Sequence, residues 1–116
     1  MSRHDPVICL RDMLEHAREA VTLSRGKTRA ELTKDRVLQL ALVQLVEIVG
    51  EAAARIPKKE QAKFPGIPWA GVIGMRNRLI HGYDVLDLKI LWDTLKDDLP
   101  RLIGELKKII PPQAGA

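Results

Sequence analysis

Apolar residues recur every three or four positions along most of the 116-residue chain, which is the spacing that an amphipathic α-helix requires. The first stretch begins at Asp5 and Pro6, a capping side chain followed by a proline suited to the first turn, and it ends at Gly26. Its apolar stripe consists of Val7, Leu10, Leu14, Ala17 and Val21. Thr28 is followed three residues later by Glu31, which is the pattern of a capping box. We therefore expect a long helix and then a short helical turn.

A second long helix is predicted over residues 35–55, and its pattern differs from that of the first. At about 100° per residue, its apolar side chains cover most of the circumference, which is typical of a helix buried on more than one side. Such a helix lies in the centre of a bundle or in an oligomer interface. The polar exceptions are three or four residues apart and form one stripe, namely Gln44, Glu47, Glu51 and Arg55. Pro57 ends the helix.

Two further helices are predicted after a lysine-rich connection at residues 57–67. One covers residues 68–80, with Gly82 as its stop, and the last begins at Asp84 or Asp87. Pro100 interrupts the leucine stripe of the last helix and predicts a kink, which costs about 3 kcal/mol if it is unrelieved. No segment has the alternation of a strand. The pattern predicts an all-α fold, an up-and-down helical bundle of four main helices plus short helical turns. It forms one domain over residues 1–116, with a disordered tail at 111–116.

Composition and charge narrow the class of protein without identifying a function. Hydrophobic residues make up 46% of the chain, enough for one compact domain. The formal net charge of +4 favours encounters with polyanions only weakly. Cys9 is the single cysteine, so no intrachain disulfide and no cysteine-based metal cage is expected. We find no apolar signal segment, and the apolar run at residues 37–49 is too short to span a bilayer. We expect a soluble, cytoplasmic protein with no membrane partner.

The predicted third helix places a charged residue on its apolar face. With Trp69 set at 0°, its apolar arc contains Val72, Ile73, Met75, Leu79, Ile80 and Tyr83. Arg76 falls at about 340°, near the middle of this arc, whereas Arg78 falls on the opposite side. Asn77 and His81 share the border between the two faces. A buried guanidinium is costly unless it is paired or lines a wet cleft.

Two explanations of Arg76 remain open at this point. It forms a structural ion pair with Glu47 or Glu51, or it lines a cleft and contacts a phosphate. His81 also has a structural explanation, because the dipole of a helix favours a cationic imidazole near its C-terminus by about 0.3–1 kcal/mol. Tyr83 can likewise be a core or interface aromatic.

Three segments of the chain resemble one known family. The eight residues from Arg76 to Tyr83 resemble the Arg-x4-His-x-Tyr motif of the HEPN superfamily, specifically of its HepT-like toxin branch. Residues 47–53 (Glu-Ile-Val-Gly-Glu-Ala-Ala) resemble the Glu-Ile-Ile-Gly-Glu-Ala segment of the family's second long helix. In the closing match, Leu91-Trp92 leads to Asp98-Leu99-Pro100. Together the matches run from the first helix to about residue 110, in the family's order. Leu32 departs from the phenylalanine of many relatives, a difference that concerns packing.

The resemblance implies a ribonuclease toxin of a toxin–antitoxin system. It implies a homodimer in which two copies of the motif face one another and share an RNA-cutting cleft. It also implies a cognate antitoxin, a nucleotidyltransferase of the MNT type, that attaches AMP to Tyr83 (AMPylation). Two other classes stay open. One is a non-catalytic helical interaction module that binds a nucleotidyltransferase and nucleotides, and the other is a helical dimer with no nucleic-acid role.

The residue types of the motif suit a metal-independent cleavage of RNA. The 2′-hydroxyl of RNA can attack the adjacent phosphodiester, which needs a proton acceptor, a proton donor and a group that stabilises the crowded anionic phosphate. Imidazoles change charge near neutral pH, so His81 can serve as acid or base. Arg76 can present two N–H groups to phosphate oxygens. No metal-ligand spacing and no cofactor site stands out.

Supporting roles are expected for Asn77, Glu47, Glu51 and Tyr83. Asn77 can orient the imidazole by hydrogen bonding, the two glutamates can steady the guanidinium, and the tyrosine can stack on a base. Arg76 and His81 lie about 140° apart on a regular helix, so the pair of one chain does not converge on a point. A cleft between two chains, or a loosened helix end at Gly82, would resolve this.

Overall fold

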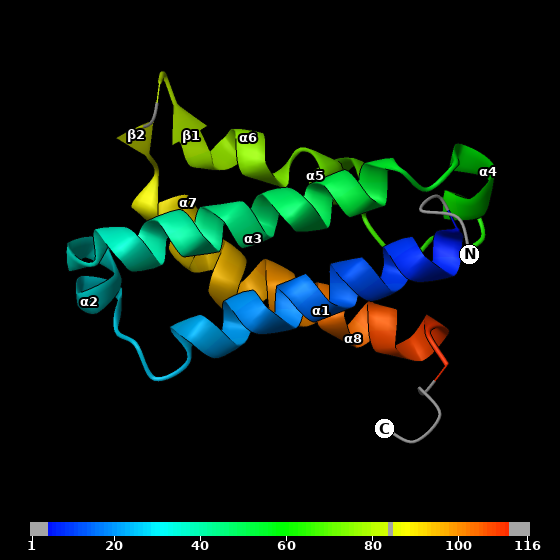
Figure 1. Ribbon diagram of the computed structural model, residues 1–116, viewed down its shortest axis with the longest axis horizontal. Helices are drawn as coiled ribbons and strands as arrows, with labels where there is room; N and C mark the ends of the chain where they lie inside the picture. The colour runs from blue at the N-terminus through cyan, green and yellow to red at the C-terminus, as the bar shows by residue number, and fades with distance from the viewer. Residues whose placement is uncertain (1–4, 84, 112–116) are drawn as a thin grey trace.

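The computed structural model describes residues 5–83 and 85–111, and the regular structure of this part of the chain is helical apart from one small hairpin (Figure 1). The chain crosses the bundle in alternating directions, first along α1 (Pro6–Ser24) and then back along α3 (Arg36–Ala54). Helices α5 and α6 lie along one side of α3, and α1 lies along the other, with α8 behind it. The predicted all-α, up-and-down bundle is therefore confirmed. Most of the predicted tail, residues 112–116, lies outside the described residues.

Local capping side chains set the start of the first three helices, as the sequence predicts. The Asp5 carboxylate accepts a hydrogen bond from the Val7 N–H at 2.9 Å at the start of α1. In the capping box of α2 (Arg29–Lys34), the Thr28 hydroxyl accepts from the Glu31 N–H at 3.1 Å, and the Glu31 carboxylate accepts from the Thr28 N–H at 2.9 Å. Asp35 caps α3 in the same way, accepting from the Leu38 N–H at 2.9 Å.

Helix α2 is fastened to α3 by one buried polar side chain. Gln39, which is 7% exposed, donates from its amide nitrogen to the carbonyl oxygens of Leu32 at 2.9 Å and Thr33 at 3.1 Å. The Leu32 side chain is 1% exposed and enters the core beside this clamp. The C-terminal end of α2 is thereby held in place on the first turn of α3.

Helix α3 is the central helix of the bundle, in contact with α1, α2, α5 and α6. It has the length and the mean hydropathy, 1.6, of a membrane-crossing helix, but a core helix of a folded domain passes the same test. One of its faces has no partner in a single chain, because Val37 is 79% and Leu40 is 53% exposed. The prediction that α3 is buried on more than one side is thus met within the chain only in part.

The predicted continuous helix over residues 68–80 is wrong. The chain forms a short helix α4 (Lys58–Gln61) in the connection, then α5 (Trp69–Ile73) and α6 (Met75–Leu79), which are separated at Gly74. Two glycines three residues apart, Gly71 and Gly74, weaken the helical preference of this stretch. Close packing against α3 also fixes the position of this stretch, because a Cβ on Gly50 of α3 would lie 3.2 Å from the backbone oxygens of both Val72 and Ile73.

The chain then forms a hairpin that the sequence analysis did not predict. Strand β1 (Ile80–His81) pairs antiparallel with β2 (Val85–Leu86), with Ile80 opposite Leu86 and His81 opposite Val85. Gly82 has a φ of +69°, which suits glycine at the turn, so it bends a hairpin instead of ending a helix. Strands of two residues are too short to show alternation, which explains the missed prediction. Asp84 lies outside the described residues.

The last helical stretch is continuous but irregular. It consists of α7 (Leu88–Asp93), a π-helical turn η1 (Thr94–Asp98) and α8 (Leu99–Ile109). Pro100 has no N–H for the carbonyl group of Lys96, and the widened π turn directly before α8 accommodates this missing bond. The π turn therefore relieves the missing hydrogen bond at Pro100, the residue at which the sequence predicted a kink. The apolar stripe is buried as predicted, at Leu91, Leu95, Leu99, Leu102 and Leu106.

Candidate active site

The structure pairs His81 with an acidic residue that the sequence analysis did not assign to the site. Nε2 of His81 lies 2.9 Å from Oδ2 of Asp87. The imidazole is on β1 and the carboxylate follows β2, so the hairpin brings together two residues that are six apart in sequence. The His81 side chain is 61% exposed and the Asp87 side chain 26% exposed. The ring is thus held at one nitrogen while it remains open to solvent.

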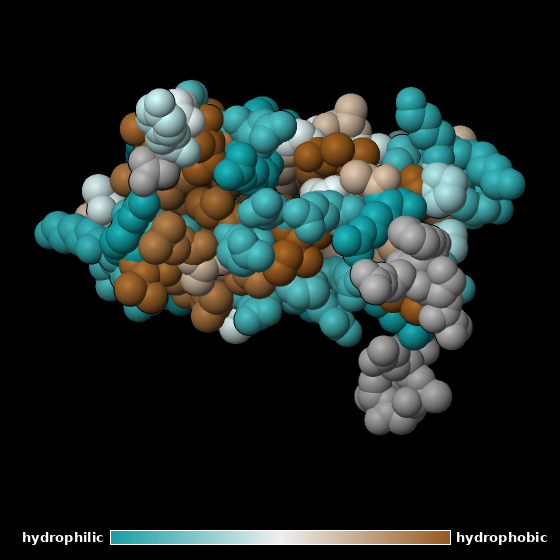
Figure 2. Space-filling view, turned by 45° about the horizontal axis from the view of Figure 1, so that its top comes forward, coloured by the Kyte–Doolittle hydropathy of each residue, from teal (hydrophilic) through white to brown (hydrophobic). Residues whose placement is uncertain are grey.

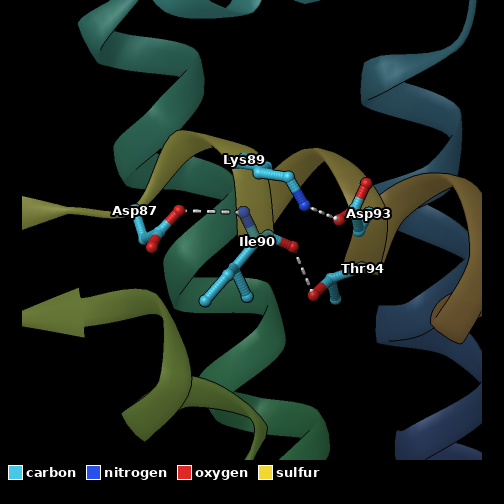
Figure 3. Close-up of polar contacts among 5 residues, drawn as sticks. All are labelled: Asp87, Lys89, Ile90, Asp93 and Thr94. Atoms are coloured by element: carbon cyan, nitrogen blue, oxygen red, sulfur yellow. Dashed lines mark hydrogen bonds and ion pairs between the residues drawn. The ribbon is translucent and has the colours of Figure 1, made fainter.

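Asp87 is held at three points. Its Oδ1 accepts a hydrogen bond from the Ile90 N–H at 3.0 Å and so caps α7 (Figure 3). Its own N–H donates to the Leu79 carbonyl oxygen at 2.7 Å, which ties the start of α7 to the end of α6. Its Oδ2 faces His81. The Ile90 N–H, and after it the His81 ring, hold the pKa of Asp87 below its usual range, so the carboxylate is ionised at neutral pH.

The first turns of α7 are built from polar contacts that surround this cap. Figure 3 shows Lys89 reaching Asp93 one turn later, at 3.3 Å, on the solvent side. The Thr94 side chain is buried, and its hydroxyl donates to the Ile90 carbonyl oxygen at 2.8 Å. Ile90 therefore forms hydrogen bonds through both its N–H and its carbonyl oxygen. The carboxylate that faces His81 is thus bonded to a residue whose own position in the first turn of α7 is fixed.

Arg76 is exposed, where the sequence predicted a place on the buried face. On the projection from Trp69, the side chains that are buried, Val72, Met75 and Leu79, lie at about 240–300°. Arg76, at about 340°, is therefore at the edge of the buried side instead of its middle. Within residues 5–83 and 85–111, Arg76 forms no hydrogen bond or ion pair, and neither does it pair with Glu47 or Glu51. Structural pairing of Arg76 with these glutamates is therefore not observed in the single chain.

Arg78 is the arginine of α6 that makes a structural contact. Its Nη1 donates to the Gly71 carbonyl oxygen at 3.0 Å, across the break between α5 and α6. It also lines a cavity of about 500 Å³ with residues of α5, α6 and α8, and neither Arg76 nor His81 lines that cavity. Arg78 is exposed, as predicted, but it is engaged by a backbone carbonyl group, whereas Arg76 forms no such bond among the described residues.

The remaining residues that the sequence assigned to the site lie on the surface. Asn77 is exposed on α6 and has no hydrogen-bond partner among the described residues, so the ring of His81 is held by Asp87 alone in this part of the chain. Tyr83 is 101% exposed beside the turn of the hairpin and is not a core aromatic. Glu51 is exposed and Glu47 half-buried on α3, which packs against α6.

Figure 2 shows hydrophilic side chains gathered over α6 and the middle of α3, next to a hydrophobic area over the N-terminal half of α3. Val37 and Leu40, in the N-terminal half of α3, are both exposed. Among the described residues, no group of three or more histidine, cysteine, aspartate or glutamate side chains is placed to hold a metal ion. The site that the structure presents is therefore an exposed imidazole with a fixed carboxylate, preceded on α6 by an unengaged guanidinium.

Comparison with known proteins identifies a family and relatives that match most of the chain. The sequence profile described as "HepT-like: Ribonuclease HepT-like" matches residues 13–109. The chain is 33% identical over 107 residues to "Putative RNase MJ1380" of Methanocaldococcus jannaschii, covering 92% of this chain and 98% of that protein. It is 37% identical over 103 residues to "Probable ribonuclease HepT" of Thermococcus cleftensis, covering 85% of this chain and 94% of that protein. No solved structure gives a significant match. With a family profile that covers most of its length and with these relatives along nearly their whole length, the chain belongs to the HepT-like ribonuclease family.

Proposed function

We propose that this protein is the toxin of a toxin–antitoxin system and a metal-independent endoribonuclease that cuts RNA by attack of the 2′-hydroxyl. The observation that carries the proposal is the exposed His81 imidazole, held at 2.9 Å by an ionised carboxylate and open to solvent on its other side. Such an imidazole can exchange protons with a substrate, which is the chemistry that this route needs. We place the protein in the cytoplasm, where its RNA substrate is found.

Arg76 supplies the second element of the proposed mechanism. Its guanidinium is exposed and forms no hydrogen bond or ion pair with a described residue, so it does not have to break an ion pair before it meets a phosphate. Two parallel N–H groups can bind two phosphate oxygens and stabilise the negative charge that develops on them. Asn77 on the same helix, and Glu47 and Glu51 on the neighbouring α3, are assigned supporting roles at the edge of this site.

A homodimer would complete the site, because the reaction needs an acid and a base and each chain supplies one histidine in the motif. The exposed apolar side chains of the α3 face support this assembly. Val37 and Leu40 expose apolar surface to water in the single chain, and burying that surface against a second chain would lower the free energy. Val85 on the hairpin, 63% exposed, adds an apolar contact at the same end of the molecule. We assign this surface to a second copy of the chain.

The segment around α2 suits contact with RNA outside the reaction centre. Its exposed cations are Arg25, Lys27, Arg29, Lys34 and Arg36. Against two carboxylates, Glu31 and Asp35, they leave residues 25–36 with a net charge of +3 out of the chain's +4. Helix α2 packs against α7, whose first turn is capped by Asp87, so the cations lie at the His81 end of the molecule. Contacts of this kind position a nucleic acid through its phosphates.

Tyr83 is assigned to regulation by a cognate nucleotidyltransferase of the MNT type. The side chain is fully exposed two residues after His81, so an enzyme can reach its hydroxyl. Attachment of AMP would add a phosphate charge and considerable bulk next to the imidazole, and both would oppose the approach of RNA. The antitoxin would thus silence the toxin without displacing the catalytic residues.

The proposal is tested with purified wild-type protein, the His81→Ala variant and the His16→Ala variant on one defined RNA. His16 is the matched control, because it is a half-buried histidine whose Nδ1 bonds to the Asp12 carbonyl oxygen within α1. His81→Ala is expected to lower the cleavage rate by about 100- to 10,000-fold, and His16→Ala to leave it nearly unchanged. Products are expected to carry a 2′,3′-cyclic phosphate, in the presence of a chelator.

Three results would contradict the proposal. A substrate with a 2′-deoxy sugar at the cleaved position should resist cutting, so its cleavage would exclude attack by the 2′-hydroxyl. Cleavage that the chelator abolishes would exclude the metal-independent route. If neither wild type nor variant cuts any RNA while both bind the nucleotidyltransferase, the protein is a non-catalytic interaction module.

A further inference from the structure

We propose that Asp87 is a positioning residue that fixes the tautomer of His81, so that Nδ1 is the ring nitrogen that exchanges a proton with the substrate. This inference rests on the proposed function and names the reacting atom of that site. It follows from the single hydrogen bond of the ring: Nε2 faces Oδ2 of Asp87 at 2.9 Å, and Nδ1 has no hydrogen-bond partner among the described residues.

Asp87 is fixed independently of His81, which is why it can hold the ring. Its Oδ1 is engaged by the Ile90 N–H at 3.0 Å, and its backbone N–H is engaged by the Leu79 carbonyl oxygen at 2.7 Å. Rotation of the carboxylate toward solvent would therefore uncap α7. With these two bonds in place, Oδ2 stays at the position where it meets His81.

The state of the carboxylate determines which nitrogen of the neutral ring carries the proton. An ionised carboxylate accepts hydrogen bonds and donates none. The Ile90 N–H holds the pKa of Asp87 below its usual range, so this carboxylate is ionised at neutral pH. Nε2 of His81 must then be the donor, and the lone pair of the neutral imidazole is on Nδ1. The side chain is 61% exposed, which leaves that lone pair accessible to a substrate.

The proton transfers balance with Nδ1 as the reacting atom. Nδ1 of the neutral His81 takes the proton of the 2′-hydroxyl, whose oxygen forms a bond to phosphorus while the bond from phosphorus to the 5′-oxygen breaks. The leaving 5′-oxygen takes a proton from a second imidazole in its cationic form, supplied by the other copy in the proposed dimer. The imidazolium formed at His81 keeps its Nε2–H on the Asp87 carboxylate, which stabilises the new positive charge.

Nitrogen NMR of the RNA-free protein, labelled with ¹⁵N in its histidines, tests the assignment directly, because protonated and unprotonated ring nitrogens have well separated chemical shifts. The His81 signals are identified by their loss in His81→Ala. In the wild type at alkaline pH, the Nε2–H tautomer is expected to predominate. In Asp87→Asn it is expected to lose this predominance. The amide oxygen caps α7 as the aspartate does, so the amide N–H group faces Nε2, which must then accept a hydrogen bond and leave the ring proton on Nδ1.

Activity provides the second readout, with a matched control elsewhere in the fold. Asp5 caps α1 by accepting from the Val7 N–H at 2.9 Å, so Asp5→Asn makes the same change of charge at the same kind of position without a histidine partner. Asp87→Asn is expected to lower kcat by about 10- to 100-fold with little change in KM, whereas Asp5→Asn should change kcat less than about twofold. Asp87→Ser, which also retains a cap but no carboxylate, should lower kcat as Asp87→Asn does.

A wild-type ring protonated at Nδ1, or a tautomer and a kcat that Asp87→Asn and Asp87→Ser leave unchanged, would overturn the inference. The NMR result does not depend on activity. If the wild type cuts no RNA, the proposed function fails, while the protonated nitrogen of His81 is still read from the spectrum. If the wild type is active with a proton fixed on Nδ1, the function stands and the assignment of the reacting atom is wrong.

Discussion

Substitution of Gly50 by alanine should destabilise the protein, although the same change usually stabilises a helix. A Cβ at this position of α3 would lie 3.2 Å from the carbonyl oxygens of both Val72 and Ile73, which are backbone atoms of α5. Ordinary contacts of a Cβ begin at about 3.4 Å, so α5 would have to move away from α3 by a few tenths of an ångström. A flexible side chain could turn aside at little cost, but a packed helix backbone cannot.

Two opposing terms set the magnitude. Removing a glycine from a helix interior gains about 0.5–1 kcal/mol, because alanine loses less conformational freedom on folding. Forcing extra volume into a packed interface costs about 1–3 kcal/mol. For Gly50→Ala we therefore expect the free energy of unfolding to fall by about 0.5–2 kcal/mol. Gly104 in α8 provides the matched control, because a Cβ there would have no neighbour within 4 Å. Gly104→Ala should stabilise by about 0.4–1 kcal/mol.

Urea unfolding followed by circular dichroism measures both variants against the wild type, at one protein concentration so that any dimer contributes equally. The expected result is a shift of the midpoints in opposite directions. Because α5 leads through α6 to His81, Gly50→Ala should also slow RNA cleavage, while Gly104→Ala should not. If Gly50→Ala stabilises as much as Gly104→Ala, α5 does not sit on Gly50 as described, and the packing that positions α6 must be different.

Four further predictions concern the cap, the clamp and the two surfaces. The pKa of Asp87 is lowered in the fold, so its contribution to stability should be full above about pH 3.9 and disappear as the pH falls through the lower folded value. The stability advantage of wild type over Asp87→Asn in urea should therefore shrink at acid pH, and an advantage that grows there would contradict this sign. Gln39→Leu removes the two hydrogen bonds to the end of α2 and should lower the free energy of unfolding by about 1–3 kcal/mol, whereas an unchanged urea midpoint would show that α2 does not need the clamp. Leu40→Glu should convert the proposed dimer to monomers in analytical ultracentrifugation, and a persistent dimer would place the interface elsewhere. In an inactive His81→Ala background, Arg29→Ala should weaken RNA binding and reduce its salt dependence. Lys58 lies on α4 at the opposite end of the molecule, and if Lys58→Ala weakens binding equally, the total charge of the protein and not the α2 segment determines RNA binding.

The first half of the chain could be predicted closely because its determinants are local. Asp5, the pair Thr28 and Glu31, and Asp35 are each within three residues of the N–H group that they cap. The clamp made by Gln39 joins residues six and seven positions apart in different helices, and no rule of helix periodicity reveals it. The sequence shows a glutamine in an apolar helix, but it does not show the two carbonyl groups to which the glutamine amide donates hydrogen bonds.

The third helix was predicted as continuous because its apolar residues fit one period. Val72, Met75 and Leu79 are buried as the projection requires, on both sides of the break at Gly74. Ile73 and Tyr83, which the projection placed in the same apolar arc, are exposed, so the buried side is narrower than that arc and Arg76 lies outside it. Periodicity identified the residues that pack against α3, but it could not show which apolar residues stay exposed.

The end of α6 at Leu79 changes the reason why the proposed site needs a second chain. On one continuous helix, Arg76 and His81 would point about 140° apart, and a cleft between two chains was one way to make them converge. In the structure His81 has left the helix for β1, and its direction is set by the hairpin and by Asp87, six residues away and beyond the reach of any helical spacing. The angle therefore no longer requires a partner. In the proposed mechanism a partner is still required by the number of proton carriers, because cleavage by a 2′-hydroxyl uses a base and an acid and the described part of each chain presents one imidazole held in this way. A variant heterodimer with a single intact His81 should consequently retain far less than half of the activity, and half activity would show that each chain works alone.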